Sequence, residues 1–393
     1  MKVAGIICEY NPFHNGHLYQ LEQTQKNATH IVCAMSGNYV QRGDMAVVDK
    51  WTRAKAAVLC GADLVIELPT PWACSSAENF AACGVYLLSA LKTDMLSFGC
   101  ETDNVKILEK AALAVDSSEI GTHIKGEMSR GLTYPAALRK AVCTLCGEEI
   151  AAVLDEPNNT LAVEYIRQSK KMNIAFEYLS IKRSGSKHSD ENPFNSYIAS
   201  AAALRRLENV NELENFIPSA MLEGLTLRER EGLYPQRVEN AERVILSFLR
   251  QMSQEEMWAF ISDENGLAMR LYRASRNATS FDELIKAVKV KSITLAAVRR
   301  AVFSCFLKIP ADIAKKTPPY VKVLAMNKKG AEIIKNSNCV LPIISRYSQV
   351  SSLSDYGKKI YSLECSCTDL YSLFSKKISG CSREQTSPIF VID

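Results

Sequence analysis

Two of the five histidines in this 393-residue chain lie three residues apart, in the string His14-Asn15-Gly16-His17. The string follows the apolar run Val3-Ala4-Gly5-Ile6-Ile7-Cys8, which is typical of a buried strand, and a helical pattern begins at Leu18. A helix N-terminus presents unpaired N–H groups and the positive end of the helix dipole, so it favours bound phosphate. Gly16 lets the backbone approach a ligand closely, and two imidazoles can donate hydrogen bonds to phosphate oxygens. The string therefore predicts a phosphate site, with a surface turn of no function as the alternative.

The elements that must position this string alternate regularly over the first 100 residues. We expect strands at residues 3–8, 31–35, 64–68 and 96–98, and helices at residues 18–25, 49–59 and 76–88. This order predicts a parallel sheet covered by helices, in which ligands bind beyond the carboxyl ends of the strands. The polar segments that fall at such ends are residues 14–17, 36–44 and 99–101.

The rest of the chain is expected to be mostly helical. One further strand is predicted at residues 174–181, and amphipathic helices follow near residues 196–207, 238–251, 254–261, 279–290 and 293–307. Residues 340–344 and 389–392 are short and apolar, and the second of these is a candidate edge strand. The length suits two domains with ample core.

Charge is unevenly distributed along the chain. The formal net charge is only +4, yet residues 266–350 hold 16 basic and 4 acidic residues. A cationic excess of this size raises the affinity for polyanions through counterion release, so we expect nucleic-acid contact in this window. For any single one of these charges, a solvated helix face is the alternative.

The 13 cysteines are scattered, and several lie within apolar segments. This usage is typical of reduced thiols in a cytoplasmic protein. Neither Cys143-x-x-Cys146 nor Cys365-x-Cys367 has a clean second half-site or a nearby histidine, so no metal site is predicted. No apolar stretch reaches membrane-spanning length, and the chain starts with a strand-like segment rather than a signal peptide. We therefore expect a cytoplasmic protein without membrane contact.

Several strings beyond the histidine motif resemble one family. They are residues 9–17, 35–43, 49–54, 63–69, 98–101 and 157–159, with a weaker match at residues 319–324. Together they resemble the bacterial tRNA(Met) cytidine acetate ligase family, which is similar in fold to the nucleotidyltransferases that carry an H-x-G-H signature. The resemblance implies an α/β fold, with a Rossmann-like nucleotidyltransferase parallel sheet in a catalytic domain at residues 1–195. A mainly helical, basic and tRNA-binding domain is expected at residues 196–393.

The resemblance also implies a reaction. The family activates acetate with ATP as acetyl-adenylate. It then passes the acetyl group to the wobble cytidine, position 34, of elongator tRNA(Met), which gives N4-acetylcytidine. ATP is therefore expected as a substrate, with acetate and tRNA(Met) as partners, and Mg²⁺ should accompany the triphosphate.

Roles for individual residues follow from the same resemblance. His14 and His17 are expected to stabilise charge that develops at the α-phosphate. Arg183 would stand in for the Lys-rich second motif of many nucleotidyltransferases, which we do not find here. The expected ATP-binding residues are Ile7, Cys8, Glu9, Tyr10, Asn11, Pro12, Phe13, His14, Asn15, Gly16, His17, Leu18, Tyr19, Gln20, Gly99, Asn158 (or its neighbour Asn159) and Arg183. Without the resemblance, the last positions would be interpreted as turn residues and a surface arginine.

Two further groups of residues have expected roles. Arg42 could pair with the acetate carboxylate, and Asp44 could serve Mg²⁺ or proton removal; a purely structural loop is the alternative. The expected tRNA-binding residues are Lys182, Arg205, Arg206, Arg299, Arg300 and Lys322. After Arg183 the family tends to show a Tyr-His-Asp-like string, whereas this chain has Lys187-His188-Ser189-Asp190, so the alignment there stays open.

Two other functions remain as alternatives. A small-molecule adenylyltransferase would share the histidine site but gives no reason for the basic window at residues 266–350. A non-catalytic RNA-binding protein on the same fold would explain the window, but the intact His14, Gly16 and His17 argue against it.

Overall fold

A parallel sheet forms the centre of the N-terminal half, as the alternating apolar pattern predicts. The computed structural model describes residues 1–183, 199–207, 209–262 and 266–392. The strands run in the order β5-β2-β1-β6-β7, and every neighbouring pair in this series is parallel. Their bounds are β1 Val3–Cys8, β2 His30–Ser36, β5 Leu64–Leu68, β6 Met95–Cys100 and β7 Glu177–Lys182.

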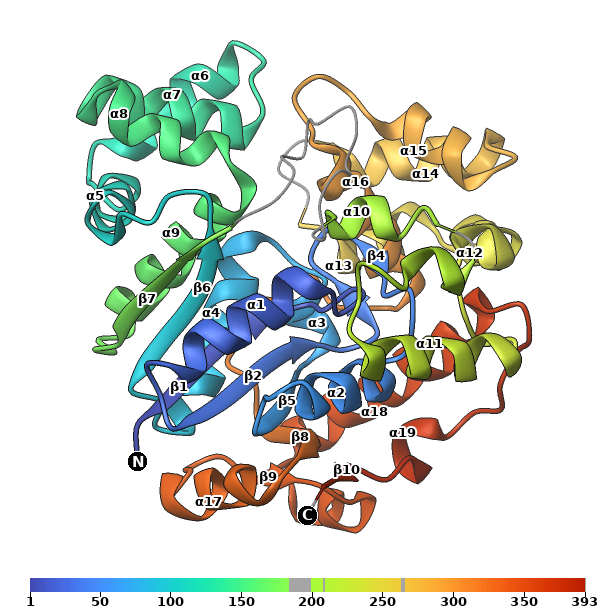
Figure 1. Ribbon diagram of the computed structural model, residues 1–393. Coiled ribbons are helices and arrows are strands. Elements are labelled where there is room, and N and C mark those ends of the chain that lie inside the picture. The colour runs from blue at the N-terminus through green and yellow to red at the C-terminus, as the bar shows by residue number, and fades with distance from the viewer. Residues whose placement is uncertain (184–198, 208, 263–265, 393) are drawn as a thin grey trace.

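Helices cover both faces of this sheet because successive side chains of a strand point to opposite faces. On β1, Ile6 belongs to the apolar cluster beneath the first two long helices, whereas Ile7 packs in the cluster on the other face. Figure 1 shows α1 and α2 in front of the sheet and α4 behind it. The covering helices are α1 Asn15–Gln25 and α2 Lys50–Leu59 on one face, and α4 Ala77–Ala90, α5 Val105–Val115 and α9 Pro157–Lys171 on the other.

The C-terminal half returns to the same sheet, which corrects the expectation of a separate helical domain. Strand β8 (Val321–Met326) lies antiparallel to β5, and the short strands β9 (Ile343–Ile344) and β10 (Phe390–Val391) pair with β8. One apolar cluster extends from the N-terminal strands through the C-terminal helices. The two halves therefore share a core, and the expected boundary at residue 195 falls outside the described residues.

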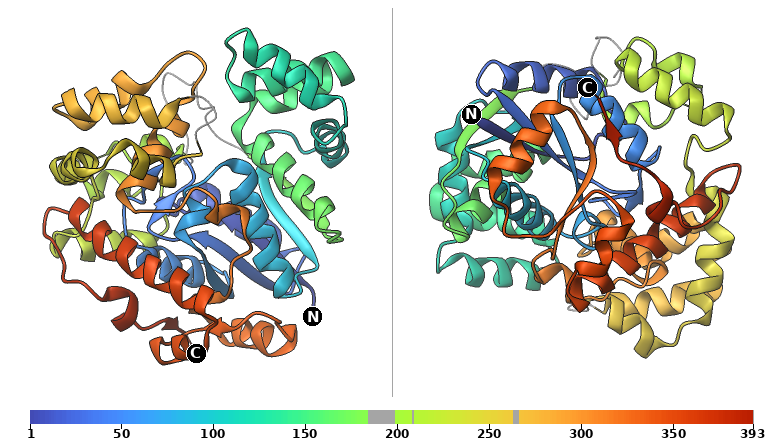
Figure 2. Two further views of the ribbon diagram at one scale, coloured as in Figure 1. Left: turned by 180° about the vertical axis from the view of Figure 1, so that it is seen from behind. Right: turned by 90° about the horizontal axis from the view of Figure 1, so that it is seen from below.

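Two groups of helices lie at the top of the view in Figure 1. The first contains α6 (Ile120–Ser129), α7 (Tyr134–Cys146) and α8 (Glu148–Ala151). The second contains α12 Val238–Gln251, α13 Gln254–Phe260, α14 Leu267–Asn277, α15 Phe281–Val288 and α16 Leu295–Phe306. All of these except α14, which was not predicted, lie close to the bounds that the amphipathic pattern predicts. Figure 2 shows the same two groups from behind and from below.

The remaining elements close the molecule around the sheet. A two-stranded hairpin, β3 (Tyr39–Val40) and β4 (Asp44–Met45), follows β2. The other helices are α3 Thr70–Ala73, α10 Ala201–Leu204, α11 Ser219–Arg230, α17 Lys328–Ser337, α18 Asp355–Tyr371 and α19 Arg383–Thr386. Within the described residues, no helix is both long enough and apolar enough to cross a membrane.

Candidate active site

The histidine string forms the start of α1, and its side chains cap the helix. His14 is the N-cap residue, and its Nδ1 accepts a hydrogen bond from the Gly16 backbone N–H at 3.1 Å. In return, the His14 backbone N–H donates to Nδ1 of His17 at 3.3 Å. The two imidazole rings stack with their centroids 3.7 Å apart. Helix α1 begins three residues before its apolar pattern does because this capping box orders the polar first turn.

These contacts fix the protonation of both rings. A backbone N–H can only donate, so each Nδ1 carries a lone pair, and the proton of each neutral ring is on Nε2. Burial, followed by the charges of Arg183 and Arg205, lowers the pKa of His14 to about 3. Burial, His14 and Arg183 likewise lower the pKa of His17 well below its usual value. Both rings are therefore neutral near pH 7, and each directs an N–H away from the helix cap.

The N–H of His14 is buried and has no acceptor within the described residues. His14 is 1% exposed, and its Nε2 has no hydrogen-bond partner there. Leaving such a donor unsatisfied costs about 1–3 kcal/mol. A phosphate oxygen at this point would satisfy it, so the local arrangement favours an anionic ligand.

Aromatic side chains pack against the ring of His17. Tyr10 packs 4.7 Å from Phe13 and 4.9 Å from His17, measured between ring centroids. Tyr10 and Phe13 are fully buried, so within the expected ATP-binding loop these two side chains support the histidines and do not face a ligand. The same burial accounts for the depressed pKa of His17.

A pocket opens where α1 meets the carboxyl ends of β6 and β7. Its lining brings together several residues that the sequence analysis selected from separate strings: Gly16, His17, Tyr19, Gln20, Gly99, Lys182 and Arg183, together with Ile181. A Cβ on Gly99 would lie 3.6 Å from Cγ of Arg183. A side chain at Gly99 would therefore occupy pocket volume without forcing the backbone to move.

Arg183 is held at the pocket by a chain of polar contacts that starts at the end of β6. Its Nη1 donates to Oδ1 of Asn158 at 3.3 Å, and Nδ2 of Asn158 donates to Glu101 at 2.5 Å. Glu101 also accepts from the Asn159 backbone N–H at 2.9 Å, while Asn159 Oδ1 accepts from the Glu101 N–H at 2.9 Å. Asn159 is thus occupied in joining α9 to the end of β6, and Asn158 is the member of the pair that contacts Arg183.

A second arginine flanks His14 from the far side of the site. Arg205, just after α10, donates from Nη1 to the Asn11 carbonyl at 2.8 Å. Its charge contributes to the low pKa of His14. The sequence analysis expected Arg205 to contact tRNA, because nothing in the local sequence shows that α10 folds back onto the histidine loop.

The hairpin after β2 carries Arg42 and Asp44, and α16 holds it in place. Nη2 of Arg299 lies 2.7 Å from Asp44, and its Nε donates to the Gly43 carbonyl at 3.1 Å. Nη1 of Arg300 donates to the Gln41 carbonyl at 3.2 Å. Arg42 lies exposed at the hairpin tip. The two arginines expected to bind tRNA are therefore engaged in fixing the hairpin that carries Arg42 and Asp44.

Asp44 sits among these cations. Burial raises its pKa, and the Arg299 and Arg205 charges act in the opposite direction. The hairpin approaches α16 so closely that a Cβ on Gly43 would overlap the backbone of Arg299 and Arg300, and Gly43 has φ +70°. Glycine is thus required at this position for two reasons.

Arg53 of α2 holds the catalytic loops together, a role that the sequence analysis missed. Its side chain is completely buried and donates to four backbone carbonyls instead of a carboxylate. The acceptors are Glu9 at 2.5 Å, Ser36 at 3.1 Å, Val48 at 3.1 Å and Gly37. One guanidinium therefore joins the loops after β1 and β2.

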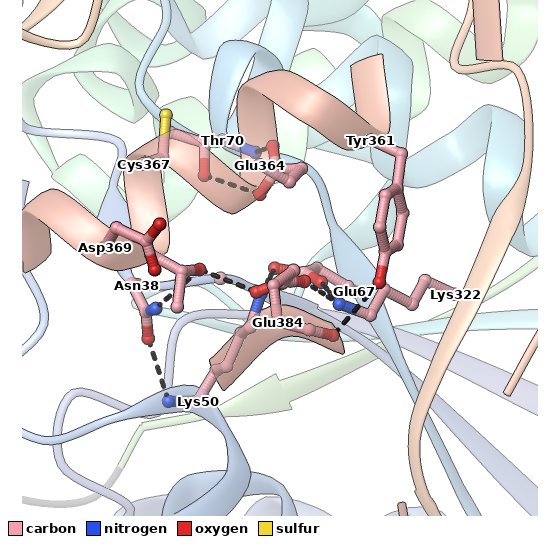
Figure 3. A network of polar contacts seen from close by, with 12 residues as sticks. Asn38, Lys50, Glu67, Thr70, Lys322, Tyr361, Glu364, Cys367, Asp369 and Glu384 are labelled. Carbon is pink, nitrogen blue, oxygen red and sulfur yellow. Dashed lines mark hydrogen bonds and ion pairs between the residues drawn. The ribbon is translucent and has the colours of Figure 1, made fainter. Parts of the chain in front are cut away.

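Lys322 does not face solvent, and the prediction that it binds tRNA is wrong. Figure 3 shows it in a buried polar network with Lys50, Glu67 and Glu384. Nζ of Lys322 lies 3.3 Å from Glu67 and is also paired with Glu384. Because β8 joins the sheet, its polar residue points into the protein, where two carboxylates compensate the charge.

The other expected tRNA contacts are exposed. Lys182 lies 3.8 Å from Asp103 at the pocket edge, and Arg206 follows α10 on the surface. Residues 187–190, where the family motif departs, lie outside the described residues. The described part of the chain contains no group of three or more His, Cys, Asp or Glu side chains that could hold a metal ion.

Comparison with known proteins agrees with this geometry. A family model described as HIGH Nucleotidyl Transferase matches residues 1–386. Relatives named tRNA(Met) cytidine acetate ligase include proteins of Caldanaerobacter subterraneus subsp. tengcongensis, 34% identical over 392 residues, and Thermoanaerobacter sp., 36% identical over 393 residues. In both cases the alignment covers 96% of this chain and 97% of the relative.

Solved structures agree as well. The crystal structure of Thermotoga maritima TmcAL in an apo form matches with a TM-score of 0.93 at 28% identity. A second crystal structure of that protein, bound with alpha-thio ATP, matches with a TM-score of 0.90 at 29% identity. Both comparisons cover 100% of each chain. This chain belongs to the HIGH nucleotidyl transferases and, among them, to the tRNA(Met) cytidine acetate ligase family.

Proposed function

We propose that the protein is an ATP-dependent ligase that joins acetate to the wobble cytidine of elongator tRNA(Met), with N4-acetylcytidine as the product. The observation that carries the nucleotide step is the buried, unpartnered Nε2–H of His14 beside the pocket. Family membership supports the choice of acetate and tRNA(Met), because the relatives carry that name. The ATP analogue bound by the Thermotoga maritima protein supports ATP as the nucleotide.

In the first reaction, an acetate oxygen attacks the α-phosphorus of ATP. The bond from this phosphorus to the bridging oxygen breaks, and pyrophosphate leaves. Nε2–H of His14 and His17 would donate to the phosphoryl oxygens as charge develops there. Both donors are fixed by hydrogen bonds before the reaction, and His14 is also buried, so they need little reorganisation. Arg183 and Arg205 would neutralise the departing pyrophosphate from two sides.

In the second reaction, N4 of the cytidine attacks the acetyl carbon. The bond between that carbon and the phosphate oxygen breaks, AMP leaves, and one proton leaves N4. The hairpin supplies Asp44 as the acceptor for this proton, since its carboxylate is oriented by Arg299 at 2.7 Å. Arg42, exposed at the hairpin tip, would pair with the carboxylate of incoming acetate.

Magnesium is expected to enter with the triphosphate. The described residues provide no preformed acidic cluster for the ion, so its ligands would be phosphate oxygens and water. No step of the proposal depends on the ion having a site in the protein.

Acetate-dependent ATP–pyrophosphate exchange tests this proposal. The wild type should exchange label only when acetate is present, and His14→Ala should lower the rate at least 100-fold while tRNA binding is retained. Exchange that ignores acetate but responds to a phosphate ester would favour a small-molecule adenylyltransferase. Absence of any exchange, with tRNA still bound, would favour an RNA-binding protein without catalysis.

A further inference from the structure

Helices α14 and α15 border an open groove of about 470 Å³ on the surface. Arg270, Arg273 and Asn277 line it from one face of α14, at spacings of three and four residues. Its other lining residues are Ala274, Ala278, Ala287 and Glu283. Small side chains along the groove would let an elongated ligand approach the helices closely.

Two arginines at the rim of the groove have exposed side chains. Arg270 and Arg273 are exposed, and within the described residues neither forms an ion pair or a side-chain hydrogen bond. Arg276 on the same helix is different, because it donates to the carbonyls of Arg250 and Met252 and stacks 4.3 Å from the Tyr272 ring. On α14, Arg276 therefore contacts the backbone of neighbouring helices, whereas Arg270 and Arg273 face solvent.

The single acid that lines the groove is already occupied. Glu283 accepts from the Thr279 N–H at 2.8 Å and from the Thr279 hydroxyl at 2.6 Å, which caps the start of α15. Within the described residues it forms no ion pair with Arg270 or Arg273. Two free guanidiniums of this kind suit bidentate contact with phosphate groups.

The groove lies in the helical group that borders the active site. Helices α14 and α15 both pack against α16, beside which they lie in Figure 1, and α16 contacts the hairpin after β2 through Arg299 and Arg300. An RNA that places one loop base in the pocket would carry its backbone past this group of helices.

We propose that the groove between α14 and α15 binds phosphates of the RNA backbone next to the loop that enters the active site, with Arg270 and Arg273 as the contacting residues. The proposal rests on the proposed function and deepens it by naming the surface that binds the substrate. Under this proposal, only some residues of the basic window at 266–350 contact RNA. Others, such as Lys322, are paired inside the protein and do not.

The test compares two double variants that remove the same charge. Arg270→Ala/Arg273→Ala changes the groove. Lys328→Ala/Lys335→Ala changes two exposed residues of α17, which lies at the opposite end of the molecule in Figure 1. Binding of elongator tRNA(Met) transcript would be measured by fluorescence anisotropy between 50 and 300 mM KCl (approximately spanning physiological ionic strength), together with acetate-dependent exchange.

We expect the groove variant to bind the transcript roughly tenfold or more weakly. Its plot of log affinity against log salt should be shallower by about 1.5, since each lost phosphate contact removes roughly 0.7–0.9 of slope. Exchange without tRNA should be unchanged, and the α17 variant should match the wild type in all three measurements. Equal affinities and slopes for the two variants would overturn the groove assignment alone. Failure of the wild type to bind the transcript would overturn the proposed function as well.

Discussion

Substitution of Arg53 by methionine should damage both stability and nucleotide binding. The buried guanidinium donates to the carbonyls of Glu9, Ser36, Gly37 and Val48. The first three lie where β1 and β2 end, and Val48 lies just before α2. Methionine fills a similar volume but donates no hydrogen bond, so it would leave all four acceptors without this partner.

The expected loss of stability follows from these four contacts. A buried polar group left without a partner costs about 1–3 kcal/mol. We use the lower end because methionine also removes the cost of burying a charge. Four carbonyls then correspond to about 4 kcal/mol in the free energy of unfolding, a large share of the roughly 5–15 kcal/mol typical of proteins. Arg53→Lys keeps the charge, but its single ammonium group cannot reach all four acceptors. Its free energy of unfolding should therefore lie between those of the wild type and Arg53→Met.

Urea unfolding and the KM for ATP in the exchange reaction measure the two effects. Arg250→Met is the matched control, because Arg250 also donates to backbone carbonyls, those of Ser275 and Ala278, but within the helical group of α12–α16. Arg53→Met should raise the KM for ATP at least tenfold, whereas Arg250→Met should leave it unchanged. An Arg53→Met protein within about 1 kcal/mol of the wild type, with normal KM, would refute this role.

Three other perturbations have defined outcomes. Glu101→Gln should raise the KM for ATP about fivefold with little change in kcat, because it loosens the contacts that hold Arg183. An unchanged KM in exchange assays would contradict this expectation. Gly43→Ala should lower the melting temperature more than Gly131→Ala, since both have positive φ but only the first Cβ would meet backbone; equal losses would contradict the packing argument. Burial and a neighbouring carboxylate raise the pKa of Glu364 from 4.5 to about 7. The folded protein then keeps a proton that the unfolded chain releases, so the free energy of unfolding should fall by about 3 kcal/mol as pH rises from 4.5 to 7. Glu364→Gln should flatten this dependence in urea titrations, and parallel curves would be the contrary result.

The strands of the N-terminal half could be predicted because their signal is local. Each buried strand is a short apolar run bounded by turn residues, and the intervening helices imply parallel pairing. Strand β8 has an equally apolar sequence, Val321–Met326, but it pairs antiparallel with β5, more than 200 residues earlier in the chain. No local pattern encodes such a pairing, so the shared core of the two halves was missed.

The candidate site likewise contains residues that the sequence could identify and residues that it could not. Gly16, His17, Gly99 and Arg183 could be selected because each follows a recognisable strand or lies in a distinctive string, and the pocket brings them together. The roles of Arg53 and Arg205 depend on backbone carbonyls of loops elsewhere in the sequence, which composition and spacing do not reveal. The residues around Arg53 and Arg205 in the sequence indicate only helical segments. They do not indicate which loops these side chains contact.

The most direct test of the account is incubation of elongator tRNA(Met) transcript with the protein, ATP, Mg²⁺ and labelled acetate, followed by nucleoside analysis. The wild-type reaction should place the label in N4-acetylcytidine. The label should disappear when ATP is omitted or when His17 is replaced by alanine. Label that persists in His17→Ala, or its absence from the wild-type reaction while ATP–pyrophosphate exchange proceeds with another acid, would contradict the central claim.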